Sequence, residues 1–89
     1  MKATLIDLLR ELMKQEALVR VVVDTQVDEF YVRMVDGKIE QVGKDVIVVE
    51  RAAISDERFK HNVANVRVAI PLARVAEVIY YERVESTPS

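Results

Sequence analysis

The chain has 89 residues, of which 51% are hydrophobic and 31% charged, with a net charge of -2. A chain this short forms one small domain with a modest core, so its large apolar fraction favours an oligomer whose subunit contacts cover the surplus. The chain lacks the strong positive net charge that most nucleic-acid-binding proteins carry. It contains no cysteine, which excludes disulfides and thiolate metal sites.

The first segment, TLIDLLRELMKQ, predicts an amphipathic helix over about residues 5–15. Apolar side chains recur there at helical spacing and form one stripe, made of Leu5, Leu8, Leu9, Leu12 and Met13. Thr4 precedes the run and Asp7 follows three residues later, which is a capping arrangement. Mixed charges on the other face do not favour a membrane surface, so we expect this helix to cover one end of a barrel, with partner binding as the alternative.

The rest of the chain predicts strands, because β-branched residues dominate it. The expected strands are residues 17–25, 29–41, 45–50, 65–72 and 74–84. A tight turn is expected in TQVDE, and a longer loop of mixed charge in RAAISDERFKHN. Short strands behind a single helix predict a mainly β fold with a strongly bent, five-stranded antiparallel barrel rather than a parallel sheet.

The two glycines of the chain lie close together in GKIEQVGKDVIVVE. Gly37 interrupts a strand pattern, where a residue without Cβ avoids a clash at a sharp bend and permits a bulge. Gly43 is expected to form the turn into the third strand, and Pro71 the corner between the last two strands.

These features together resemble the bacterial Sm-like proteins of the Sm and Hfq group, and most of all short Sm-like domains of unknown function. Gly37, Ile39 and Asp45 match the first motif of that family, and RVAIPLARVAEVI fits the corner of the second motif. The resemblance implies one Sm-like, SH3-like domain over residues 1–85, with the barrel at about 18–84. The small and polar residues of ESTPS predict a disordered tail at 86–89. It also implies a homo-oligomeric ring, in which edge strands at about 66–72 and 75–83 pair between neighbouring subunits.

The chemistry of the family is less well matched than its topology. RNA-binding Sm proteins carry an asparagine shortly after the aspartate, whereas this chain has Val46, Ile47 and Val48. The corner is IPLAR, so Arg74 stands alone where Sm proteins have an Arg-Gly pair and Hfq a Lys-His pair. The usual uridine pocket is therefore not supported.

Basic side chains in and around the long loop and the corner are the candidate nucleic-acid-binding residues, namely Arg58, Lys60, Arg67 and Arg74. Phe59 lies between two of them, and cations beside an aromatic ring could hold phosphate and stack a base. Asp56 and Glu57 in the same loop offset that charge, so an ordinary exposed loop is the competing interpretation.

Other candidate sites have simpler explanations. His61 is the only histidine and lies in the polar loop, without the partners of a zinc site or a catalytic triad. Carboxylates near the first hairpin, Asp24, Asp28, Glu29 and Asp36, are typical of turns, with an acidic patch as the alternative. Tyr80 and Tyr81 are adjacent on one expected strand, so one should face inward and the other outward.

We therefore predict no catalytic residues, no metal and no cofactor. The leading hypothesis is a non-enzymatic, ring-forming binding or assembly module. The alternatives are an RNA-binding chaperone that uses the non-standard basic residues, and an accessory subunit that docks on another protein. The absence of a long apolar run and of a secretory leader predicts a cytoplasmic protein without membrane contact.

Overall fold

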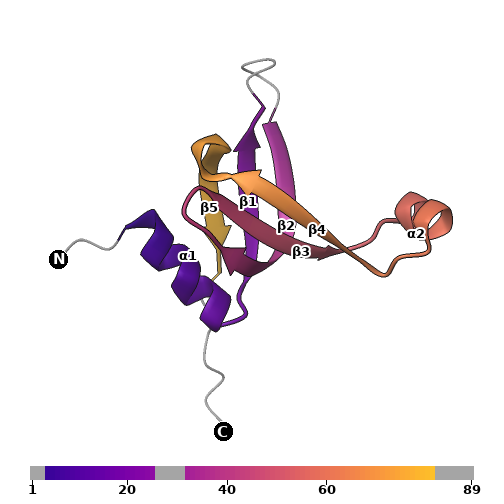
Figure 1. The fold of residues 1–89 in the computed structure, drawn as a ribbon, viewed down its shortest axis with the longest axis horizontal. Coiled ribbons are helices and arrows are strands. Elements are labelled where there is room, and N and C mark those ends of the chain that lie inside the picture. The colour runs from indigo at the N-terminus through magenta and orange to yellow at the C-terminus, as the bar shows by residue number, and fades with distance from the viewer. Residues whose placement is uncertain (1–3, 26–31, 82–89) are drawn as a thin grey trace, which may run out of the picture.

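The computed structural model describes residues 4–25 and 32–81. Along the chain lie α1 (Leu5–Lys14), β1 (Leu18–Asp24), β2 (Val32–Val42), β3 (Val46–Ala52), α2 (Ser55–His61), β4 (Asn65–Pro71), the 3-10 turn η1 (Leu72–Arg74) and β5 (Val75–Tyr80), as Figure 1 shows. The prediction of a mainly β fold, with an N-terminal helix and five antiparallel strands, is confirmed. The expected tight turn and the expected disordered tail lie largely or wholly outside the described residues.

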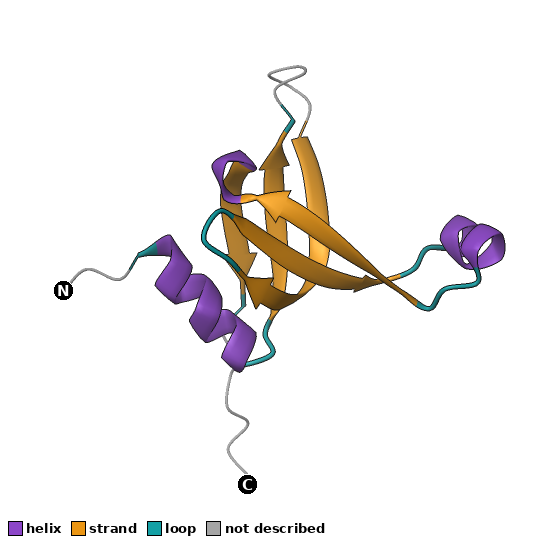
Figure 2. Ribbon diagram, viewed as in Figure 1, coloured by secondary structure: helices purple, strands orange, loops and turns teal. Residues whose placement is uncertain are grey.

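The first helix begins where the sequence predicts. The Thr4 hydroxyl accepts a hydrogen bond from the Asp7 backbone N–H at 3.1 Å, and the Asp7 carboxylate accepts one from the Thr4 N–H at 3.2 Å. This reciprocal cap satisfies two donors that a helix start would otherwise leave unpaired. The helix ends in a turn at Glu16, whose φ of 52° reverses the chain into β1. Figure 2 shows α1 lying against one end of the sheet.

The sheet has the strand order β4-β3-β2-β1-β5, and each pairing in it is antiparallel. In a flat sheet the two edges would lie roughly 19 Å apart, since neighbouring strands are spaced by about 4.8 Å. Yet β4 and β5 are joined only by the three residues of η1, which rise about 2 Å each. The sheet must therefore curl strongly, and Figure 1 shows β3 and β4 crossing the direction of β1.

The curled sheet is open, which differs from the barrel that the sequence predicts. Among the described pairings, β4 bonds only to β3, and β5 bonds only to β1. The chain passes along η1 from one edge of the sheet to the other without a ladder between them. In residues 4–25 and 32–81, the outer edges of β4 and β5 consequently have no strand paired with them.

The core lies inside the curl and beneath α1. Leu9 and Leu12 of α1 are buried against β-strand side chains such as Val21, Ile47 and Val49. Burial alternates along the middle of the sheet, as Val35 and Ile39 of β2 are buried while the residues next to them are more exposed. This period of two is the pattern expected for strands with one face on a core.

The segment after β3 is a helix rather than the expected loop. Residues Ser55–His61 form α2, which contributes no buried side chain and lies at the tip of the β3–β4 ribbon (Figure 1). Acidic residues occupy its first turn and basic residues its last, an order that favours a helix because it complements the helix dipole. Within residues 4–25 and 32–81, no helix has the length and apolar character needed to cross a bilayer.

Candidate functional site

Strand β2 changes its pairing partner beside Gly37. Its first part pairs with β1 as far as Lys38, and from Lys38 onward it pairs with β3. A Cβ atom added to Gly37 would overlap the backbone oxygen of Glu50 and would lie 2.9 Å from the Glu50 carbonyl carbon. The backbones thus approach too closely for any side chain at this position. The break in register with β3 falls farther along, between Ile39 and Gln41.

The turn after β2 contains Gly43 and Asp45, and Pro71 lies next to it at the end of β4. The Gly43 N–H donates to the Val46 carbonyl at 2.7 Å, which closes the turn between β2 and β3. The Asp45 carbonyl accepts a hydrogen bond from the Leu72 N–H at 2.8 Å and so ties that turn to η1. Pro71 is the last residue of β4, with φ -60°.

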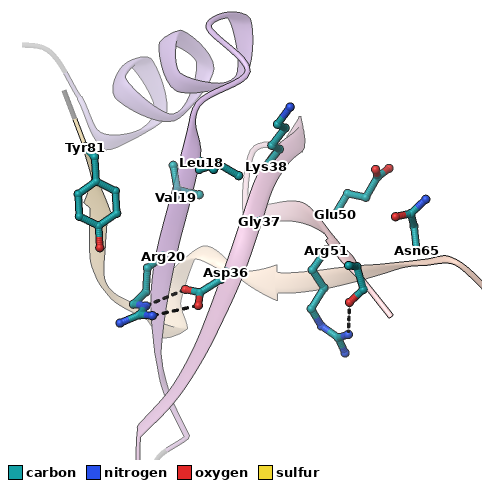
Figure 3. Close-up of a pocket in the computed structure, with 11 residues that line it drawn as sticks. Leu18, Val19, Arg20, Asp36, Gly37, Lys38, Glu50, Arg51, Asn65 and Tyr81 are labelled. Carbon is teal, nitrogen blue, oxygen red and sulfur yellow. Dashed lines mark hydrogen bonds and ion pairs between the residues drawn. The ribbon is translucent and has the colours of Figure 1, made fainter. Parts of the chain in front are cut away.

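A cavity of about 480 Å³, here called the bend cavity, lies next to Gly37. Its polar lining comes from several strands, namely Arg20, Asp36, Lys38, Glu50, Arg51 and Asn65, with Tyr81 on one side (Figure 3). Figure 3 shows the Arg20 guanidinium turned toward the Asp36 carboxylate, and two hydrogen bonds of 2.7 and 3.0 Å join these groups. The bonds from Arg20 lower the pKa of Asp36 below its ordinary value.

A second ion pair fixes α2 to the end of β3. The Arg51 guanidinium donates to both carboxylate oxygens of Glu57, at 2.7 and 3.0 Å, and the Ile54 N–H donates to the same carboxylate at 3.0 Å. These hydrogen bonds, with the one from Arg51 foremost, lower the pKa of Glu57 to about 2. The two partners are only 21% and 24% exposed, so this is the most sheltered ion pair in the described part of the chain.

The bend cavity carries several polar side chains on a partly apolar lining, and these side chains do not form an assembled reaction centre. Its lining contains no His, Ser or Thr side chain, and its best aligned charges, Arg20 and Asp36, already neutralise each other. His61 lies at the exposed end of α2, away from the cavity lining. In the described segments, no cluster of three or more His, Asp or Glu side chains is placed to hold a metal ion.

The four candidate nucleic-acid-binding residues do not converge on one surface. Arg58 and Lys60 lie on α2, where Arg58 donates to the Ala53 carbonyl at 3.1 Å and Lys60 pairs with Asp56 at 3.4 Å. Arg67 of β4 makes two contacts of 2.7 Å with Glu40.

Arg74 lies in η1 and donates to the Thr25 carbonyl at 3.3 Å. Each of the four cations therefore already has an acceptor in this chain, and their positions extend from α2 along β4 to η1.

The carboxylates grouped in the sequence are also separated in the structure. Asp36 points into the bend cavity and pairs with Arg20, whereas Asp24 lies at the end of β1, beside a different hollow. Asp28 and Glu29 fall outside the described residues. The expectation for the tyrosines is wrong, because Tyr80 and Tyr81 are both exposed, at 42% and 69%. Strand β5 ends at Tyr80, so alternation along the strand does not extend to Tyr81.

The free edge of β4 has a defined hydrogen-bonding pattern. Ala53 donates to the carbonyl of Ala64, directly opposite, and Leu72 donates in the same way to Asp45. Because bonded and non-bonded pairs alternate along an antiparallel ladder, these two bonds fix which residues of β4 face β3. The backbone groups of Asn65, Arg67 and Ala69 therefore point away from the sheet, as does the carbonyl of Pro71.

The other edge is β5, and its ladder with β1 is interrupted. The register shifts between Val22 and Val23, which leaves Ala76 without a partner residue in β1. Such a bulge increases the local twist of an edge strand. The two edges of the sheet are thus different surfaces, one ending in a proline and the other carrying a bulge.

Two groups of exposed apolar side chains are found in the described residues, and Met34 of β2 is exposed outside both. One is α2 with its flanks, where Phe59 is 91% exposed and Ile54 is 61% exposed. The other is a groove of about 640 Å³ between α1 and the end of β5, called here the α1–β5 groove. Its lining includes Leu8 and Leu12 from α1, Leu18 from β1, and Tyr80 and Tyr81. Figure 1 shows α1 and α2 on opposite sides of the molecule.

The sequence indicates Phe59 only as a partner for nucleic-acid bases, and it gives no sign of the α1–β5 groove. The charge order of SDERFKH was a usable signal for α2, but the groove is formed by segments far apart in the chain. Comparisons of the chain with protein-family models, curated proteins and solved structures give no significant match.

Proposed function

We propose that this chain is a non-enzymatic assembly module of the Sm-like, SH3-like barrel type, in which copies join edge to edge and the resulting ring is the functional object. The observation that carries the proposal is the open sheet, whose edge strand β4 directs unpaired backbone groups outward at Asn65, Arg67 and Ala69. An unpaired edge of this kind is a template for a further strand.

The nature of the two edges supports a ring. Pairing β4 of one copy with β5 of the next joins two different surfaces, and a contact of this heterologous kind repeats from copy to copy until it closes or forms a filament. The strand order puts at the edges the same two strands that the resemblance to Sm-like proteins assigns to subunit contacts. Curling of the sheet gives each copy an angle between its edges, which favours closure over a straight filament.

Assembly also explains the apolar surplus of the chain. Large hydrophobic side chains are exposed in the single copy, including Leu18, Ile54 and Phe59. Contiguous groups of exposed apolar side chains can mark interaction sites, and those at α2 and at the α1–β5 groove are candidates for such contacts. The RNA-binding alternative has weaker support, because its four cations are dispersed and already bonded.

The proposal is tested by measuring the mass of the native assembly before and after one outward-facing backbone N–H donor is removed. Ala69 faces outward on the free edge, so Ala69→Pro removes an outward N–H without breaking a hydrogen bond to β3. We expect the wild-type protein to form one defined oligomer in native mass spectrometry, and Ala69→Pro to give a folded monomer with the same far-ultraviolet circular dichroism.

Ala69→Ser is the matched control, because it changes the side chain and keeps the N–H donor. It should assemble like the wild type. A wild-type protein that stays monomeric at every concentration would reject the proposed function, and so would an Ala69→Pro variant that assembles normally.

A further inference from the structure

The edge strands are short for an interface on their own. Strand β5 has six residues and β4 has seven, and β4 ends in a proline. Backbone pairing over this length buries little surface, whereas stable interfaces bury about 800 Å² on each partner. A ring built from these edges therefore needs a further contact close to the paired strands.

The geometry points to such a contact: α2 of one copy docks through Phe59 into the α1–β5 groove of the next copy. This inference rests on the proposed edge pairing, and it adds the side-chain contact that gives that pairing its direction. The occupant of the groove is thus a second copy of this chain rather than a different protein.

Chain direction provides the first argument. Each pairing within the sheet is antiparallel, and antiparallel pairs are slightly more stable than parallel ones. If β4 pairs antiparallel with a neighbour's β5, its Asn65 end lies beside the neighbour's Tyr80 end. Tyr80 and Tyr81 form one wall of the α1–β5 groove.

The short connection between α2 and β4 is the second observation that supports docking. Helix α2 ends at His61, and residues 62–64 are all that separate it from β4. The four Cα–Cα steps from His61 to Asn65 extend over at most about 14 Å. Pairing at the edge therefore brings the end of α2 close to the neighbour's Tyr80 end, which borders the groove.

Exposure also fits. Phe59 is 91% exposed and Val63 is 38% exposed, so α2 and the segment after it present apolar side chains that this copy does not cover. The helix cannot fill the groove of its own copy, because α1 and α2 lie on opposite sides of the molecule (Figure 1). A groove on one side and a projecting helix on the other are complementary only between copies.

The charge of the groove and that of the last turn of α2 are opposite in sign, which also favours this contact. The one carboxylate in the groove belongs to Glu11, and the wall contributes no cation. Phe59 is flanked in the sequence by Arg58 and Lys60, and the last turn of α2 is basic. Docking brings an aromatic ring onto the apolar side chains of the groove and the basic last turn of α2 toward Glu11.

Cysteine cross-linking tests this contact, because the chain has no cysteine of its own. Phe59→Cys protein mixed with Leu18→Cys protein should form a disulfide-linked dimer of the two variants under mild oxidation. Leu18 is 64% exposed and lines the groove, so both changes are tolerated by the fold. The control is Phe59→Cys mixed with Ala73→Cys, since Ala73 lies at the opposite end of the β5 edge and is exposed.

A cross-link to Leu18→Cys and none to Ala73→Cys is the expected result. The reverse pattern would indicate parallel pairing and would overturn the inference. In a second experiment, the Phe59→Ser oligomer should dissociate at a concentration at least tenfold higher than the wild-type oligomer does. Thermal unfolding of the single copy should be unchanged.

These experiments separate the two proposals. If the wild type is monomeric, edge assembly itself fails. If the wild type assembles and Ala69→Pro abolishes that assembly, while Phe59→Ser assembles as strongly as wild type and no cross-link to Leu18→Cys forms, edge pairing stands and docking of α2 is rejected.

Discussion

Gly37 lies where the backbones of β2 and β3 approach too closely for a Cβ atom, so every other amino acid would meet the same obstacle there. A Cβ atom there would meet the Glu50 carbonyl group and would lie 3.0 Å from a methyl carbon of Val49. The obstacle is backbone that belongs to a paired strand, so it cannot move aside as the end of a flexible side chain would. We expect Gly37→Ala to lower the free energy of unfolding by about 1–3 kcal/mol, measured as a shift of the urea midpoint.

Gly43→Ala is the matched control for this substitution. At Gly43 the nearest atoms to an added Cβ are those of Val46 at 3.2 Å, which leaves more room than at Gly37. Its loss of stability should be the smaller of the two. Equal midpoints for the two variants would contradict the assigned role of Gly37.

Glu57 gives a pH-dependent prediction. Its pKa is lowered in the folded protein to about 2 by the hydrogen bonds from Arg51 and Ile54, compared with 4.5 ordinarily. The stabilisation from a lowered carboxyl pKa is present above the unfolded value and is lost as the pH falls toward the folded value. We expect α2 to loosen between about pH 4.5 and pH 2.

Hydrogen exchange of the Arg58 and Asn62 amides reports on this change, since both bond within α2 or to its cap, at 3.0 Å. In the wild type, their protection should decrease over that pH range after correction for the intrinsic exchange rate. Glu57→Gln should be less protected at neutral pH and nearly insensitive to acid. A difference between the two proteins that is the same at pH 6 and at pH 2.5 would refute the assignment.

Among the structural elements, α1 and α2 are capped differently. The Thr4 hydroxyl caps α1 through the Asp7 N–H, whereas at α2 the cap residue Ile54 has no capping side chain and its N–H donates to the Glu57 carboxylate. Because α1 buries Leu9 and Leu12 in the core, loss of its cap affects the whole fold. Thr4→Ala should therefore cost about 1 kcal/mol in urea unfolding.

Ser55→Ala is the comparison at the start of α2, and we expect it to change global stability by less than about 0.5 kcal/mol. The Ser55 side chain is exposed, and no side chain of α2 is buried. A loss for Ser55→Ala as large as that for Thr4→Ala would show that α2 is coupled to the core more strongly than its exposure indicates.

The same contrast explains which elements could be predicted. Helix α1 carries a full apolar stripe with a cap, and the strands carry β-branched residues, so local patterns were sufficient for them. Helix α2 has seven residues and only Phe59 as a large apolar side chain, which leaves no periodicity to detect. The open sheet and the α1–β5 groove depend on segments that are distant in the chain, such as those that bring Leu12 and Tyr80 to one groove, and local patterns do not specify those.

For the molecule as a whole, the net charge of -2 bears on nucleic-acid binding. If Arg58, Lys60, Arg67 and Arg74 all contacted phosphates of a single strand, the logarithm of the affinity would fall with the logarithm of salt with a slope of about -3. We expect no such dependence, and no measurable binding of oligo-U or oligo-A at low salt by fluorescence anisotropy. Binding with that slope, weakened by Arg74→Ala, would favour the RNA-binding alternative.

Pro71 has a consequence for any strand that joins the β4 edge. Its position among the outward-facing residues means that the row of donors at Asn65, Arg67 and Ala69 stops there, while a carbonyl acceptor remains. If an incoming strand were shifted by two residues toward Pro71, one of its carbonyl groups would face a carbon of the proline ring instead of an N–H donor. Pro71 thereby selects one register of the joining strand against registers shifted toward the end of β4.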